Sequence, residues 1–382
     1  MCTPRIARPS NFVSSTTTRR GTRKIRASES EFGAILLAGG KGTRLRPLTI
    51  HTPKPIVPIF DRPFLRYQID LLKKVPEIDE AILSLNYQPR RIEELFGGGE
   101  EVGLNIRYVV EPAPLGTAGA VRYAGETLHE SVVVFNGDVL TEVDLGTVIA
   151  LHRTRRAKAT IVLTPVDNPA AYGLVETDAS GQVRRFLEKP DPADVTCNTI
   201  NAGIYVLEPD TFDRIPRDTP WSIERSFFPS LIERGETFIG HVHRGYWIDI
   251  GTPEKYAQVH RDIREGRYSA PPFAGSPSTI CVSPHARVEE GAILEPPCFV
   301  DEGAIVRAGA RIGSYSVIGR QCHLEEQAVV DCSIVWANTR ISQGSVVRRS
   351  ILGRHCHIGK YVTIENGVVL GDKSVLTDYC RL

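Results

Sequence analysis

The chain has a glycine-rich loop directly after a short apolar stretch. Residues 34–38 are apolar, and the segment 39–47 (GGKGTRLRP) follows them. A glycine-rich loop after a strand lets backbone N–H groups come close to a phosphate, although this spacing matches neither a Walker A loop nor G-x-G-x-x-G. Two cations accompany it: Arg44 in the loop, and Lys54, whose backbone is stiffened by a proline on each side. We therefore expect Arg44 and Lys54 to bind phosphate groups.

Two aspartates are placed to hold a divalent metal ion. Asp138 follows the apolar run 132–135 and an Asn-Gly pair, and Asp249 alternates with two isoleucines, so that it faces away from their apolar side. Carboxylate oxygens suit Mg²⁺, which usually keeps waters and substrate phosphates among its ligands. For Asp138, a simple turn cap is the alternative interpretation. With the two cations, the two acids would form a phosphoryl- or nucleotidyl-transfer site.

The remaining motifs carry less information. Glu188-Lys189 closes a strand expected over 183–187, and it is interpreted either as part of the site or as a surface ion pair of little energetic value. H-E-x-x-H and G-x-S-x-G are absent from the sequence. The absence of these two catalytic motifs agrees with a transfer site whose chemistry needs no histidine or cysteine.

Residues 33–262 alternate between strand and helix patterns, which predicts a mostly parallel sheet with helices on both faces. Ligands bind such sheets beyond the carboxyl ends of the strands. Asp144 is expected to cap a helix. The expected strands are 34–38, 81–85, 106–110, 132–135, 160–166 and 183–187. The expected helices are 64–74, 90–96, 117–128, 145–157, 222–234 and 253–263.

Residues 282–382 repeat with a period of six. An aliphatic residue recurs at every sixth position from Val282 to Val330, the register then slips by one residue twice, and the series ends at Leu376. A small residue follows the leading aliphatic by four positions, as Ala286 follows Val282. This period predicts a parallel β-helix whose three flat sides enclose both residue types.

The repeat also predicts which side chains leave the β-helix core. Cys356 falls on an inward position, so His355 and His357 point outward and the three cannot share a metal ion. At least one large side chain of 334–336 should turn outward, because the register slips there. We expect this domain to self-associate or to dock onto the rest of the chain, and to contain no catalytic group.

Composition and charge exclude several classes of protein. The chain has 46 Lys and Arg against 45 Asp and Glu, which lacks the basic surplus of a nucleic-acid binder. No apolar run approaches the roughly 18 residues of a membrane span, so we expect no membrane partner. The eight cysteines show no C-x-x-C spacing, and a reducing, cytoplasmic location is expected.

Two segments lie outside the two expected domains: one precedes the first domain, and the other joins it to the second. Residues 1–28 hold seven basic residues and no acid, and we interpret 1–32 as a disordered basic leader. A transit peptide or a wrongly assigned start codon are the alternatives. A segment rich in proline, glycine and serine, 269–278, lies within a linker expected over 264–280.

Six motifs in order resemble the sugar-1-phosphate nucleotidyltransferases: GGxGTRLxP, PKP, NGD, EKP, NAGIY and YWxDIGTP. The resemblance covers residues 33–382. The segment 115–120 (LGTAGA) and the pair Asn86-Tyr87 are most similar to the mannose-1-phosphate guanylyltransferase branch. The resemblance implies an α/β fold: a Rossmann-like nucleotidyltransferase domain at 33–263, then a left-handed parallel β-helix at 281–382.

The resemblance also implies a role for individual positions. Arg44 and Lys54 would neutralise the α-phosphate and the leaving pyrophosphate, and Asp138 and Asp249 would bind Mg²⁺. The nucleotide would be held by Ala38, Gly39, Gly40, Gly42, Thr43, Glu111 and Gly116. The sugar phosphate would be contacted by Gly173, Glu188, Lys189, Asn201 and Gly203.

The implied reaction joins GTP and mannose 1-phosphate into GDP-mannose and pyrophosphate, in a homo-oligomer. Glucose 1-phosphate with UTP, dTTP or ATP, and a heptose or cyclitol phosphate with GTP, stay open as substrates. A non-catalytic regulatory subunit is a further alternative. The presence of all four charged site residues argues against it. An acyltransferase is another, because β-helices of this type often carry that activity.

Overall fold

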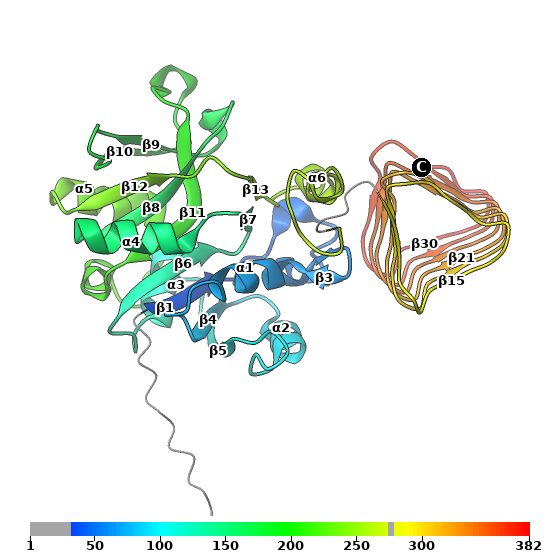
Figure 1. The fold of residues 1–382 in the computed structure, drawn as a ribbon, viewed down its shortest axis with the longest axis horizontal. Coiled ribbons are helices and arrows are strands. Elements are labelled where there is room, and N and C mark those ends of the chain that lie inside the picture. Colours follow the sequence, from blue (N-terminus) through cyan, green and yellow to red (C-terminus); the bar gives the residue numbers. More distant parts are fainter. Residues whose placement is uncertain (1–31, 274–278) are drawn as a thin grey trace, which may run out of the picture.

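The computed structural model describes residues 32–273 and 279–382, which form two domains side by side (Figure 1). The expected leader lies outside the described residues, apart from its last residue, Phe32. Residues 274–278 of the expected linker also lie outside them.

A nine-stranded sheet forms the centre of the first domain. Its strands are β1 (Phe32–Leu37), β4 (Glu80–Leu85), β5 (Asn105–Val110), β6 (Ser131–Asn136), β8 (Ala159–Pro165), β9 (Gly173–Thr177), β10 (Val183–Glu188), β11 (Thr199–Leu207) and β12 (Phe238–Val242). The main path runs β10-β9-β11-β6-β1-β4-β5, with β8 beside β11 and β12 beside β8. Strands β6, β1, β4 and β5 are mutually parallel, whereas β11 is antiparallel to β6, β8 and β9.

Helices cover both faces of this sheet, as the strand and helix alternation predicts. The helices of this domain are α1 (Phe64–Leu72), α2 (Pro89–Phe96), α3 (Gly116–Ala124), α4 (Leu145–Arg155), α5 (Phe228–Glu233) and α6 (Pro253–Arg264), of which α6 packs at the contact between the domains. Helices α1, α2 and α4 bury apolar residues in one cluster, and α3 and α5 bury theirs in a second cluster on the opposite face. Asp144 caps α4 as expected, since its carboxylate accepts from the N–H of Gly146.

The helix expected over 222–234 is two shorter elements. A π-helical turn, Ile223–Phe227, comes first, and α5 follows it directly. Pro229 is the physical reason for the break, because it lacks the N–H that a continuous α-helix would need. The π-turn holds Glu224, which points to the site described below.

The second domain stacks its strands in three parallel sheets. The first contains β14 (Ile280–Val282), β17 (Cys298–Val300), β20 (Val317–Ile318), β23 (Ile334–Val335), β26 (Ile351–Leu352) and β29 (Val369–Leu370). The second contains β15 (Arg287–Val288), β18 (Ile305–Val306), β21 (His323–Leu324), β24 (Arg340–Ile341), β27 (His357–Ile358) and β30 (Val375–Leu376). The third contains β16 (Ile293–Leu294), β19 (Arg311–Ile312), β22 (Val329–Asp331), β25 (Val346–Arg348) and β28 (Thr363–Ile364). This is the predicted left-handed parallel β-helix.

The β-helix core follows the hexapeptide register. Cys356 is buried while His355 and His357 are exposed, and the described residues contain no group of three His, Cys, Asp or Glu side chains arranged for a metal ion. The first coil of the β-helix departs from the prediction that the leading aliphatic side chains are enclosed in the core. Val282 and Val288 are 36% and 37% exposed, because they belong to the end of the stack, where one side has no further coil to pack against.

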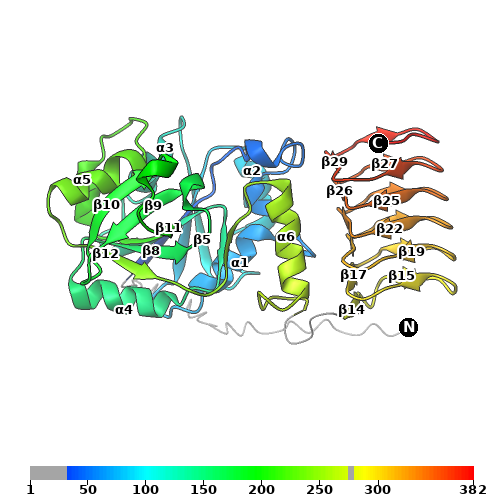
Figure 2. The ribbon, with the colours of Figure 1, turned by 90° about the horizontal axis from the view of Figure 1, so that it is seen from above.

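The first sheet of the β-helix packs against the first domain through α6 (Figure 2). Trp336 turns out of its own coil and is only 2% exposed. Its Nε1–H donates to the hydroxyl of Tyr256 in α6, at 2.9 Å. The expectation that this domain docks onto the rest of the chain is therefore confirmed. Tyr268 and Phe273, within the expected linker, are buried in the same contact.

Candidate active site

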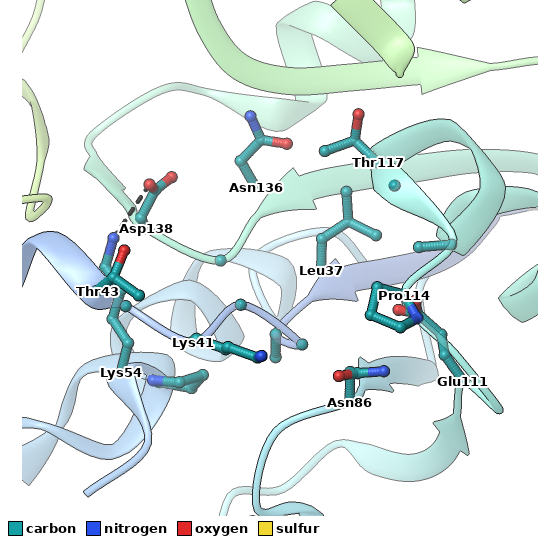
Figure 3. A pocket seen from close by; sticks show the side chains of 18 of the residues that line it. Leu37, Lys41, Thr43, Lys54, Asn86, Glu111, Pro114, Thr117, Asn136 and Asp138 are labelled. Atoms are coloured by element: carbon teal, nitrogen blue, oxygen red, sulfur yellow. Dashed lines mark hydrogen bonds and ion pairs between the residues drawn. The ribbon is translucent and has the colours of Figure 1, made fainter. Parts of the chain in front are cut away.

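A cavity of about 650 Å³ opens at the carboxyl ends of β1, β4 and β6. The glycine-rich loop forms one wall, and the residues that directly follow or end the three strands form the floor. Figure 3 shows Lys54 and Asp138 at one end of the cavity and Glu111 and Pro114 at the other. Among the residues proposed from the sequence, those that line it are Ala38, Gly39, Gly40, Gly42, Thr43, Arg44, Lys54, Glu111, Gly116 and Asp138.

The loop after β1 is shaped by two short turns. Gly42 has the left-handed φ of 59° and begins a 3-10 turn over Thr43–Leu45, a conformation that favours glycine. The hydroxyl of Thr49 donates to the carbonyl of Gly42 at 2.7 Å and holds the loop closed. A second 3-10 turn, Lys54–Ile56, starts at a proline and places the Lys54 ammonium in the cavity.

Asp138 and Asp249 come from two strands that pair with each other. Strand β7 (Val139–Thr141) is antiparallel to β13 (Trp247–Asp249), with Asp249 opposite Val139. The N–H that follows Asp249 donates to the carbonyl of Asp138 at 2.9 Å. Between the aspartates and β1, Gly137 leaves no room for a side chain, since a Cβ there would lie 2.1 Å from the Leu37 carbonyl oxygen.

Arg44 reaches the same corner. A Cβ added at Gly251 would lie 3.0 Å from the guanidinium carbon of Arg44 and 3.0 Å from Oδ2 of Asp249. The glycine-rich loop and the second aspartate thus converge around Gly251, although Asp249 itself does not line the cavity. This position brings Arg44, Lys54 and both carboxylates to one end of the cavity.

Lys255 and Tyr172 belong to this cluster and were missed in the sequence. Lys255, in the first turn of α6, forms an ion pair with Asp249, and the Tyr172 hydroxyl donates to the same carboxylate at 3.2 Å. Burial lowers the pKa of Lys255, but its hydrogen bonds to Asp249 and Tyr172 outweigh that effect and raise it. One signal in the sequence could have identified Lys255: the helix expected over 253–263 starts four residues after Asp249, so its first turn lies near that carboxylate.

Glu111 lies at the opposite end of the cavity. Its Oε2 accepts from the N–H of Leu115 at 3.0 Å, and its Oε1 accepts from the hydroxyl of Ser84 at 3.2 Å. These bonds hold the carboxylate beside Gly39 and Asn86, with further lone pairs free to accept from a ligand. The arrangement suits a ligand group that donates hydrogen bonds.

None of the sugar-site candidates lines this cavity. Gly173 and Glu188 face each other across β9 and β10. Burial raises the pKa of Glu188, and the nearby Glu224 carboxylate raises it further. Thr117, on the wall, donates to Glu224 at 3.0 Å. Glu224 is a third residue that the sequence analysis missed.

Asn201, Gly203 and Lys189 occupy the same region. The amide of Asn201 donates to the hydroxyl of Tyr205 at 2.9 Å, as does that of Asn136 on the cavity wall at 3.3 Å. Oδ1 of Asn136 is buried without a hydrogen-bond partner among the described atoms. The side-chain Oδ1 of Asn201 accepts from the N–H of Gly203. Lys189 is attached to this region through its backbone, which donates to the Tyr172 carbonyl.

Residues 33–266 match the family model described as nucleotidyl transferase, and residues 294–382 match the one described as GMPPB C-terminal domain. The chain belongs to the nucleotidyl transferase family. The first match spans the cavity, both aspartates and all the sugar-site candidates.

Named relatives match this chain over most of their own length. The chain is 38% identical to a mannose-1-phosphate guanylyltransferase of Mycobacterium tuberculosis, with 83% of each chain covered. It is 34% identical to a probable mannose-1-phosphate guanylyltransferase of Arabidopsis thaliana, with 91% of this chain and 98% of the relative covered. A UTP–glucose-1-phosphate uridylyltransferase of Synechocystis is 31% identical, with 82% and 84% covered.

A solved structure resembles the first domain. HddC from Yersinia pseudotuberculosis, in a complex with GMP-PN, matches with a TM-score of 0.51 and 30% identity, over 59% of this chain and 96% of its own. Within the family, this site therefore combines a glycine-rich anion loop, two cations and two carboxylates at one end with a hydrogen-bond acceptor at the other. Such a cavity can hold a nucleoside triphosphate along its length.

Proposed function

We propose that the protein transfers a guanylyl group from GTP to mannose 1-phosphate, forming GDP-mannose and pyrophosphate. The observation that carries the proposal is the convergence of Arg44, Lys54, Asp138 and Asp249 around one end of the cavity. The 38% identity to a mannose-1-phosphate guanylyltransferase over most of both chains supports the choice of substrates.

In the proposed reaction, a phosphate oxygen of the sugar phosphate attacks the α-phosphorus of GTP. The bond between that phosphorus and the oxygen bridging to the β-phosphate breaks, and pyrophosphate leaves. A phosphate monoester has its second pKa near 6, so it is largely dianionic at neutral pH and needs no general base. The protein then contributes position and charge.

Arg44 and Lys54 would neutralise the charge that develops on the α-phosphate and on the departing pyrophosphate. We assign the metal site to Asp138 and Asp249, whose oxygens suit Mg²⁺ when substrate phosphates and waters complete its shell. Bound there, the ion would polarise the phosphoryl oxygens. Lys54 and Lys255 already stand beside the two carboxylates, and they would hold these side chains in position.

We assign recognition of the guanine base to Glu111. Guanine offers two neighbouring N–H donors, and a carboxylate held as Glu111 is can accept from them. On the sugar side, we assign the hydroxyl contacts to Glu188, Asn201 and the backbone at Gly173 and Gly203, with Lys189 at the phosphate. The orphaned Oδ1 of Asn136 offers one further acceptor to a substrate hydroxyl.

Pyrophosphate release from each pairing of GTP, UTP, dTTP or ATP with mannose 1-phosphate or glucose 1-phosphate tests the proposal. We expect the highest kcat/KM with GTP and mannose 1-phosphate. A preference for UTP and glucose 1-phosphate would reject the guanylyl assignment and favour the uridylyl reaction named for the Synechocystis relative. No release with any pair would favour a non-catalytic subunit.

We further propose that the reaction runs in the cytoplasm and that the chain forms a homo-oligomer. All the cysteines among the described residues are free thiols, as is usual in a reducing compartment. No helix in the described ranges is long and apolar enough to cross a membrane. The open first coil exposes Ile280 and Ile293 by 44% and 54%, which supports a surface for self-association.

A further inference from the structure

A second cavity, of about 440 Å³, lies where the two domains meet. His51 and Arg91 line it from the first domain, and Arg354, His355 and Lys373 line it from the β-helix. Asp372 is the one carboxylate among its described lining residues. The cavity is separate from the active site and shares no lining residue with it.

The basic groups of this cavity form no close ion pairs. Within the ranges 32–273 and 279–382, none of the five forms an ion pair with a carboxylate within 4.0 Å. The Nε atom of Arg354 is buried without a hydrogen-bond partner among the described atoms. Asp372 acts on this guanidinium as an opposite charge, and Arg91 acts on it as a like charge. Asp372 is already engaged, by the Thr52 hydroxyl at 3.0 Å and the backbone N–H of Arg354 at 2.8 Å.

The repeat of the β-helix builds one wall. His355 and Lys373 occupy the same left-handed corner of successive coils, with φ of 57° and 64°, and the Lys373 N–H donates to the Arg354 carbonyl at 2.7 Å. Strands in neighbouring coils are about 4.8 Å apart, so the two side chains stand one above the other. Both side chains therefore face the same space.

The other wall is the beginning of α2. This helix has no acidic residue in its first turn and no side-chain cap, because the amide of Gln88 donates instead to the carbonyl of Ile50 at 3.1 Å. The free N–H groups of a helix start favour anions. Three cationic side chains, two histidines and an uncapped helix start thus surround a space large enough for a small metabolite.

We propose that this junction binds a small anion that carries a phosphate group, and that binding is transmitted to the active site. The transmitting segment is short. His51 lines the junction and Lys54 lines the active site, while Thr52 between them is hydrogen-bonded to Asp372 of the β-helix. An anion drawn to Arg354 and Lys373 would shift Asp372, and with it the turn that carries Lys54.

Calorimetric unfolding and titration of the full chain with inorganic phosphate, against sodium chloride at equal ionic strength, test the binding. We expect Lys373→Gln and His355→Gln, which change exposed side chains, each to weaken the phosphate affinity of the junction about tenfold. Lys360→Gln, the same change elsewhere on the β-helix, should leave it unaltered. Arg44→Gln serves to remove phosphate binding at the active site, which would otherwise add to the calorimetric signal.

Equal phosphate affinity in Lys373→Gln, His355→Gln and the Lys360→Gln control would overturn the binding site. Glucose 6-phosphate in place of inorganic phosphate distinguishes the sources: tighter binding of the ester supports a phosphorylated metabolite, and tighter binding of the free ion supports phosphate itself. These readouts need no catalysis, so they stand whether or not GTP is the substrate.

The coupling rests on the proposed function and has its own test. Phosphate should change the KM for GTP in the unaltered chain and in Lys360→Gln, and should not change it in Lys373→Gln. Thr52→Val should keep phosphate binding but lose the effect on KM. An effect on KM that persists in Thr52→Val and Lys373→Gln would overturn the coupling and assign it to the active site.

Discussion

The ammonium group of Lys54 lies 3.1 Å from Oδ2 of Asp138. A cation proposed to bind phosphate and a carboxylate proposed to bind metal therefore form one ion pair. Asp249 repeats the arrangement with Lys255. Each carboxylate is held in place by a lysine, so its position does not depend on the metal ion alone.

Asp138→Asn and Asp249→Asn should each lower kcat by at least about 10²-fold, because several kcal/mol of charge stabilisation would be lost with the metal ligand. Pyrophosphate release measures the effect, and the unfolding transition shows whether the variant is folded. Asp144→Asn, at the start of α4, is the matched control and should keep its activity. A folded Asp249→Asn variant with near-normal turnover would contradict the assignment.

Glu188→Gln should raise the KM for mannose 1-phosphate about tenfold or more, since a charge-assisted hydrogen bond is lost, and should also stabilise the fold at neutral pH. The pKa of Glu188 is raised in the folded chain above its usual value of 4.5, so the ionised form destabilises the folded state at pH 7. The gain in stability should shrink as the pH falls, and vanish below about 4.5. Glu233→Gln, on the exposed side of α5, should show neither effect.

Tyr256→Phe should destabilise the domain contact by about 1–3 kcal/mol, because Trp336 Nε1–H would be left buried without an acceptor. Urea unfolding measures the change, with Tyr361→Phe at an exposed site of the β-helix as control. Combining it with Trp336→Phe gives the coupling energy of the pair. If the two changes are simply additive, the bond does not hold the domains together.

His260→Gln should flatten the pH dependence of stability below pH 6.5. Burial, with Arg264 nearby, lowers the pKa of His260 from 6.5 to about 3. Between these values the unfolded chain binds a proton that the folded chain does not, so the free energy of unfolding falls by about 1.4 kcal/mol per pH unit as the pH drops. Acid unfolding curves should show this slope in the unaltered chain and in His285→Gln. The same slope in His260→Gln would contradict the assignment.

The sequence alone determined the features that depend on short spacings. The glycine-rich loop, the apolar strands and the hexapeptide repeat each lie within a few residues of chain, and their backbone geometry follows from those residues. The capping of α4 by Asp144 is of this kind. The expectation that Asp138 and Asp249 share a metal ion came from their residue type and their positions beside apolar strands, and the family motifs agreed with it.

Only the tertiary structure decided what distant segments do together. It placed Lys255 and Tyr172 on Asp249, set Glu224 near Glu188, and left the sugar-site candidates outside the lining of the cavity. It also turned Trp336 toward α6 and gathered three cations and two histidines at the domain junction. These contacts join residues far apart in the chain, and they form because whole elements pack to bury a shared core, which no local spacing encodes.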